Sequence, residues 1–187
     1  MSALPKQTMT ADAFIAWALK QPKEAGRFEL LDGHVIKMMS ERLVHVEVKG
    51  AIYTAFRDAI RRGKRPCFPV GDGAMVRITK NRTYGPDGLV YCGDRHSADT
   101  VEVPNPCIVV EVVSPDSADR DHGEKVQAYF SLPSVEHYLI VDPERRVVIH
   151  HRRAEGEDIL TRFRKSGRLK LEPPGIDVDV GAFFERA

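Results

Sequence analysis

The chain has 187 residues, 42% of them hydrophobic, and its 28 Lys and Arg against 27 Asp and Glu give a formal net charge of +1. This balance excludes a disordered chain and argues against a protein that binds nucleic acid through bulk positive charge. The length suits one domain that spans residues 1–187, with 1–9 as a loose N-terminal extension.

The cysteine pattern and the N-terminus bear on the compartment of the protein. Cys67, Cys92 and Cys107 form no close pair in the sequence and no metal-type spacing, and such a sparse, odd number of cysteines favours a reducing compartment. Residues 1–10 do not resemble a signal peptide, and no segment approaches the roughly 20 apolar residues of a membrane span. We therefore expect a soluble, cytoplasmic protein that makes no membrane contact.

The first half of the chain predicts two helices, a hairpin and then a change to strand periodicity. The expected elements are a helix that Thr10 caps and that Pro22 and Gly26 end, strands over 27–31 and 34–38 around an Asp32-Gly33 turn, a long amphipathic helix over 41–62, and short strands over 67–70, 75–78 and 89–91.

The second half predicts a central strand followed by a helix and hairpins. The continuous apolar run over 107–113 is typical of a buried strand. The expected elements after it are a helix over 119–132, strands over 137–141 and 147–151 around a turn at 142–145, and further short strands over 158–180. Together these elements indicate an α/β protein.

Glu111 interrupts the apolar run that should form the most buried strand. A buried carboxylate is costly unless it is paired or bound to a metal, so this residue is a candidate for a site. The alternatives are a strand end at which Glu111 reaches solvent, or a buried salt bridge with an arginine.

Asp87 and Lys125 are weaker candidates when each is taken alone. Asp87 lies in a Pro-Asp-Gly sequence that is an ordinary turn signal, but it also opens a short strand, and two carboxylates at neighbouring strand mouths could hold a hard divalent cation. Lys125 would usually be a solvated helix residue. The return from strand to helix could instead bring it over the C-terminal end of the Glu111 strand.

The histidines and the basic C-terminal hairpins can be explained by ordinary structural roles. None of the seven histidines has metal-binding spacing, and we expect a packing or supporting role for His45. Basic residues between 150 and 168 are interleaved with acidic ones, which fits either an ordinary charged surface or a patch that contacts DNA phosphates.

An ordered set of motifs over residues 10–180 resembles the Uma-two family of restriction-endonuclease-like proteins, in the PD-(D/E)XK nuclease superfamily. The matching segments are Phe28-Glu29-Leu30-Leu31-Asp32-Gly33, His45, Pro86-Asp87, Val110-Glu111-Val112-Val113-Ser114-Pro115, Arg120-Asp121-His122-Gly123-Glu124-Lys125, Tyr129, and Tyr138-Leu139-Ile140-Val141-Asp142-Pro143.

The resemblance implies a restriction-endonuclease-like core with a mixed, curved central sheet flanked by helices. It also implies that Asp87, Glu111 and the backbone carbonyl of Val112 are metal ligands and that Glu29 is an additional acid. The motif lysine should stand at position 113, where this chain has Val113, so the resemblance makes Lys125 its replacement.

The function that follows is metal-dependent hydrolysis of phosphodiester bonds, with DNA as the expected substrate and a homodimer as the expected assembly. Oxygen ligands suit Mg²⁺ or Mn²⁺, whereas Zn²⁺ would favour His and Cys. The rival interpretation, favoured by Val113, is a catalytically inactive DNA-binding or protein-interaction module on the same scaffold. A third is a hydrolase of smaller phosphoesters.

Overall fold

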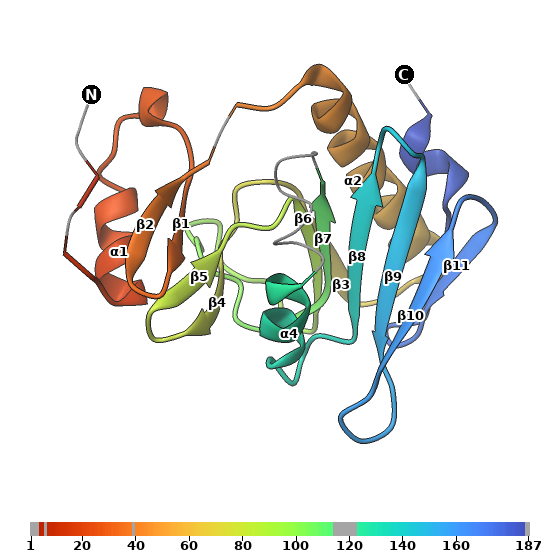
Figure 1. Ribbon diagram of the computed structural model, residues 1–187. Helices are drawn as coiled ribbons and strands as arrows, with labels where there is room; N and C mark the ends of the chain where they lie inside the picture. Colours follow the sequence, from red (N-terminus) through yellow and green to blue (C-terminus); the bar gives the residue numbers. More distant parts are fainter. Residues whose placement is uncertain (1–3, 6, 39, 114–122, 186–187) are drawn as a thin grey trace.

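The computed structural model describes residues 4–5, 7–38, 40–113 and 123–185 (Figure 1). A six-stranded sheet crosses its centre in the spatial order β10-β9-β8-β7-β6-β3. Only the β7–β8 pair is parallel, so the sheet is mixed, as the family resemblance implies. Its strands are β3 (Cys67–Val70), β6 (Gly88–Cys92), β7 (Pro106–Val112), β8 (His137–Asp142), β9 (Val147–Arg153) and β10 (Ile159–Arg164).

Two helices cover opposite faces of this sheet (Figure 1): α2 (Leu43–Gly63) and α4 (Glu124–Phe130). Because side chains alternate along a strand, β7 contributes Val110 to the core under α2 and Val109 to the core under α4. The same alternation points Glu111 toward α4. The N-terminal residues 119–122 of the helix expected over 119–132 lie outside the described residues.

A smaller antiparallel sheet lies beside the central one in the order β2-β1-β5-β4, with α1 (Ala11–Ala18) against it (Figure 1). The Thr10 hydroxyl accepts a hydrogen bond from the backbone N–H of Ala13 at 3.3 Å, which confirms the expected N-cap. The strands are β1 (Phe28–Leu31), β2 (His34–Lys37), β4 (Val76–Thr79) and β5 (Arg82–Tyr84), and only β5 was not expected from the sequence.

The C-terminal part adds a two-stranded sheet of β11 (Arg168–Leu171) and β12 (Ile176–Asp179) on the α2 side. Short 3₁₀ helices cover Lys23–Ala25 (η1) and Gly181–Phe184 (η2). Among the helices that the structure describes, none is both long and apolar enough to cross a membrane.

The cysteines lie closer together in the fold than their spacing in the sequence indicates. Cys67 on β3 and Cys92 on β6 are register partners and form a disulfide, and the Cys107 thiol lies 3.7 Å from the Cys92 sulfur. Strand register brings together residues that lie 25 positions apart, which spacing alone could not show. The cysteine pattern therefore does not support a reducing compartment, and the cytoplasmic location stays a prediction.

Candidate active site

Glu111 is held inside the protein by two donors from one helix. It is 4% exposed, and its Oε1 accepts hydrogen bonds from Lys125 Nζ and from the Tyr129 hydroxyl, each at 2.8 Å. Lys125 and Tyr129 lie one turn apart on α4, so both side chains reach the same point of β7. The alternative of a solvent-facing strand end is wrong, and the cation beside Glu111 is Lys125 rather than an arginine.

Glu29 lies on the other side of the Lys125 ammonium. Its Oε1 is 3.5 Å from Lys125 Nζ and accepts a hydrogen bond from the backbone N–H of Gly85 at 3.2 Å. The ring of Tyr84 is 5.3 Å from the same ammonium. Glu29 and Lys125 are each 1% exposed, so the smaller sheet and α4 enclose this ion pair together.

Asp87 is fixed to the strand that carries Glu111. Its backbone N–H donates to the carbonyl of Val110 at 3.0 Å, and its Oδ2 accepts from the backbone N–H of Val112 at 2.7 Å. These two bonds bracket Glu111 in the sequence, so the backbones of Asp87, Glu111 and Val112 lie together at one end of β6 and β7. The Val112 N–H thus orients Asp87, while the role of its carbonyl as a metal ligand stays a prediction.

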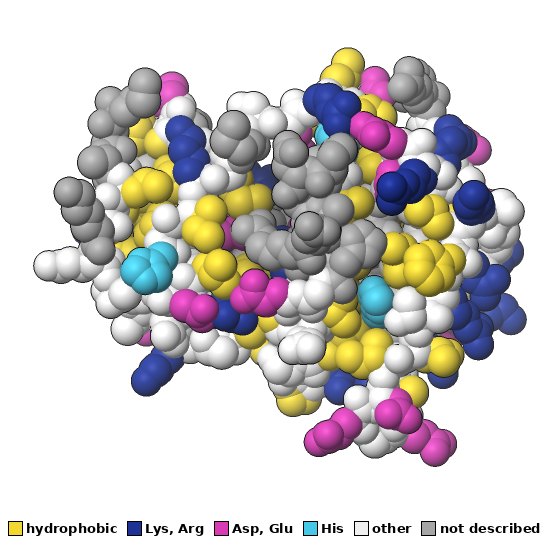
Figure 2. All heavy atoms as spheres, in the orientation of Figure 1, with side chains coloured by type: hydrophobic (Ala, Val, Ile, Leu, Met, Phe, Trp, Pro, Cys, Tyr) yellow, Lys and Arg dark blue, Asp and Glu magenta, His cyan; other side chains and the backbone are white. Residues whose placement is uncertain are grey.

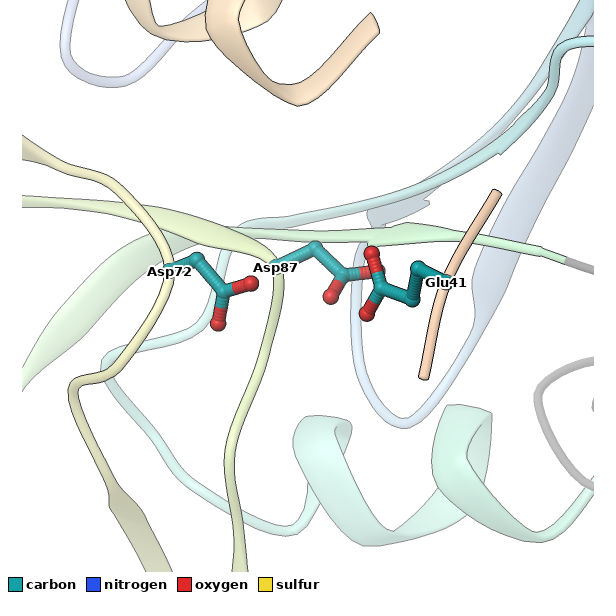
Figure 3. A group of neighbouring side chains, drawn as sticks. All are labelled: Glu41, Asp72 and Asp87. Atoms are coloured by element: carbon teal, nitrogen blue, oxygen red, sulfur yellow. The ribbon is translucent and has the colours of Figure 1, made fainter. Parts of the chain in front are cut away.

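Asp87 also belongs to a second acidic group, which it forms with Glu41 and Asp72 (Figure 3). One carboxylate oxygen from each of Glu41, Asp72 and Asp87 lies within 4.8 Å of the others, and the three side chains converge from different segments. The ammonium of Lys49, on α2, contacts all three: Asp87 Oδ1 at 2.6 Å, Asp72 Oδ2 at 3.1 Å, and Glu41. Arg27 pairs with Asp72 and lies 3.8 Å from Asp87.

This second group was missed from the sequence, although one signal was present. Lys49 follows Val48 and precedes Ile52 by three residues, and both of these pack into the core under α2. A lysine at that position is 9% exposed, and such a buried ammonium requires carboxylate partners. The partners, Glu41 and Asp72, come from segments that carry no motif, so only the fold identifies them.

The buried tyrosines at the site keep their protons. Burial, together with the charge of Glu111, raises the pKa of Tyr129 well above its usual value, and burial also raises the pKa of Tyr84. The Tyr129 hydroxyl therefore acts as a hydrogen-bond donor to Glu111 at any ordinary pH.

We expect Tyr129→Phe to lower the free energy of unfolding by about 1.5–3 kcal/mol, since it removes a hydrogen bond to a buried charged group. Urea unfolding checks this, with Tyr53→Phe as the control because Tyr53 is 38% exposed. Equal changes in the two variants would mean that the bond to Glu111 contributes nothing.

The fold is that of a nuclease-like α/β protein. A crystal structure from Anabaena variabilis ATCC 29413, described as a putative nuclease belonging to DUF820, superposes with a TM-score of 0.71 over 94% of this chain and 97% of that one, at 14% identity. The chain belongs to the Uma2 family, described as putative restriction endonuclease, whose model matches residues 11–180. The resemblance drawn from the sequence motifs is thereby confirmed.

A curated relative supports the same extent of similarity. The uncharacterized protein slr1290 of Synechocystis sp. is 24% identical over 182 residues, which cover 96% of this chain and 93% of the relative. The similarity thus runs through nearly the whole length of both proteins.

Proposed function

We propose that this chain is a Mg²⁺- or Mn²⁺-dependent endodeoxyribonuclease whose cleavage centre lies at the end of β6 and β7. The observation that carries the proposal is the bracketing of Glu111 by the two backbone bonds of Asp87, with the Lys125 ammonium 2.8 Å from Glu111. Two carboxylates at the ends of adjoining strands and a cation from a neighbouring helix are the groups that phosphodiester hydrolysis uses.

The donor set fits a hard divalent cation. Asp87, Glu111 and the Val112 carbonyl would hold the ion, with Glu29 as a further acid, because all of them offer oxygen ligands. When bound, such an ion supplies positive charge to the phosphoryl oxygens and makes a nearby water more acidic.

The chain's own residues have separate tasks in this proposal. Lys125 holds the Glu111 carboxylate in place and adds positive charge where negative charge builds on the phosphate. It thereby takes the task of the motif lysine, since Val113 can neither orient water nor carry charge. Lys49 holds the orientation of Asp87 through its 2.6 Å contact with Oδ1.

The test is the nicking of supercoiled plasmid with Mg²⁺, Mn²⁺ or EDTA. We expect metal-dependent nicking by the wild type, and a loss of roughly 100-fold or more in Asp87→Asn and Glu111→Gln, because each removes several kcal/mol of transition-state stabilisation. The matched control is Glu157→Gln, an exposed acid on the β9–β10 connection. Equal nicking by all four proteins would indicate a contaminating nuclease and overturn the proposal.

The rival is a nuclease-like module that binds DNA without cutting it. The observation that favours it is that lysine ammoniums already lie against the candidate ligands, Lys49 against Asp87 and Lys125 against Glu111. Tight duplex binding with no metal-dependent nicking would select this rival.

A homodimer remains part of the nuclease proposal, because cutting both strands of a duplex requires two centres.

A further inference from the structure

The C-terminal strands form a cavity of about 340 Å³ that is rich in cations. Figure 2 shows Lys and Arg side chains gathered along the right-hand side of the molecule, where Figure 1 places β10 and β11. The cations that line the cavity are Arg152, Arg162, Arg164, Arg168 and Lys170, and none of the residues that line it is acidic.

Strand register places this cavity on the face of the sheet opposite to Glu111. Arg162 and Arg164 are two residues apart on β10, so they share a face, and Arg164 is the register partner of Val148. Val148 belongs to the core under α2, whereas Glu111 contacts α4. The cavity is therefore not a part of the candidate active site.

The arginines of the cavity are poorly satisfied by the protein itself. Among the described residues, Arg168 pairs with Asp177 at 3.1 Å, while Arg152, Arg162 and Arg164 form no ion pair. In addition, the Nε of Arg164 is buried without a hydrogen-bond partner in the described part of the chain. An unpaired N–H of a charged group is costly, so contacts within the described residues do not account for the guanidinium of Arg164 at this position.

We propose that this cavity binds phosphate groups of a DNA backbone, as a contact separate from the cleavage centre. The inference rests on the proposed function for the identity of the polymer, because phosphate oxygens are the acceptors that arginine forks match best. Arg162 and Arg164 stand about 7 Å apart along β10, which forms a row rather than a single point. A row suits successive phosphates of a strand better than one free phosphate.

The test is fluorescence anisotropy with a labelled duplex of about 20 base pairs in EDTA, titrated between about 50 and 200 mM salt. We expect Arg162→Gln/Arg164→Gln to weaken binding by roughly 10-fold at low salt and to reduce the slope of log K against log salt by about two. The charge-matched control, Arg57→Gln/Arg61→Gln on the exposed side of α2, should retain the wild-type slope. Lys170→Gln, at an exposed position, provides a milder second variant that should reduce the slope by about one.

Several outcomes separate this inference from the proposed nuclease. Equal binding by the cavity variants and the control would overturn the cavity assignment while leaving plasmid nicking unaffected. Displacement of the duplex by inorganic pyrophosphate at the same molar concentration as the duplex would instead assign the cavity to small anions. That result would overturn the assignment to a DNA backbone. Loss of duplex binding in the cavity variants together with a wild type that never nicks would support the cavity and reject the nuclease.

Discussion

Replacing Lys125 with methionine is expected to lower the free energy of unfolding by about 3–5 kcal/mol at neutral pH, because it removes the cation from a buried ion pair. The ammonium lies 2.8 Å from Glu111 and 3.5 Å from Glu29, and all three residues are buried. Methionine fills a similar volume, so the loss reports charge rather than a cavity. Urea unfolding followed by circular dichroism measures it.

The double variant Lys125→Met/Glu111→Gln is the control, since it removes one charge of each sign. It should recover much of the lost stability at neutral pH. A double variant that is less stable than Lys125→Met would show that the pair does not couple in this way.

The expected loss of stability can itself lower the measured activity of Lys125 variants. A variant that has lost several kcal/mol can lose nicking because it unfolds, not because the reaction lacks its cation. Activity of Lys125→Met therefore has meaning only at a temperature at which unfolding experiments show it to be folded. The isosteric changes Asp87→Asn and Glu111→Gln each remove one charge and leave volume unchanged.

The sequence indicated the residues at the centre of the candidate site because Glu111 violates a strong rule. An acidic residue inside an apolar strand demands a partner, and the order of the motifs indicated Asp87 and Lys125 as its neighbours. The positions of α2 and of the central strands followed from periodicity, and the mixed sheet followed from the resemblance. Each of these depends on local pattern or on motif order.

The features that were missed depend on register and long-range packing. Lys49 meets Asp72 across 23 positions, and Cys67 meets Cys92 across 25. The β5 strand, Arg82–Tyr84, has only three residues, and its place between β1 and β4 is set by pairing rather than by its own pattern. No local signal fixes such contacts, because they exist only once the strands have paired.

A second large effect is expected at low pH from two buried histidines. They are His137 on β8 and His150 on β9, and His150 also lines the cation-rich cavity. His137 Nε2 lies 2.8 Å from the Pro173 carbonyl, which can only accept, so this nitrogen carries the proton. His137 Nδ1 then accepts from His150 Nε2 at 2.9 Å. A proton added to His137 Nδ1 would face the N–H of His150, so protonation of His137 would break this hydrogen bond.

Burial lowers the pKa of His137 to about 4, and burial together with His137 and Arg152 lowers the pKa of His150 to about 3. Histidines in the unfolded chain have a pKa of about 6.5. Below that pH the unfolded chain therefore binds protons that the two buried histidines of the folded protein do not bind. The free energy of unfolding is therefore unaffected by this pair above about pH 6.5. It decreases by about 3 kcal/mol per histidine as the pH falls toward 4. Urea unfolding between about pH 7 and 4.5 measures this loss.

Carboxylates titrate in the same range, so the comparison must be made between variants. His150→Gln keeps an amide N–H that can donate to His137 Nδ1 but removes one titrating ring, and its free energy of unfolding should fall less steeply with acidification than that of the wild type. His34→Gln, at an exposed position on β2, should follow the wild-type curve. A His150→Gln curve parallel to both would show that the buried pair does not oppose protonation, and the acid sensitivity would then belong to the carboxylates alone.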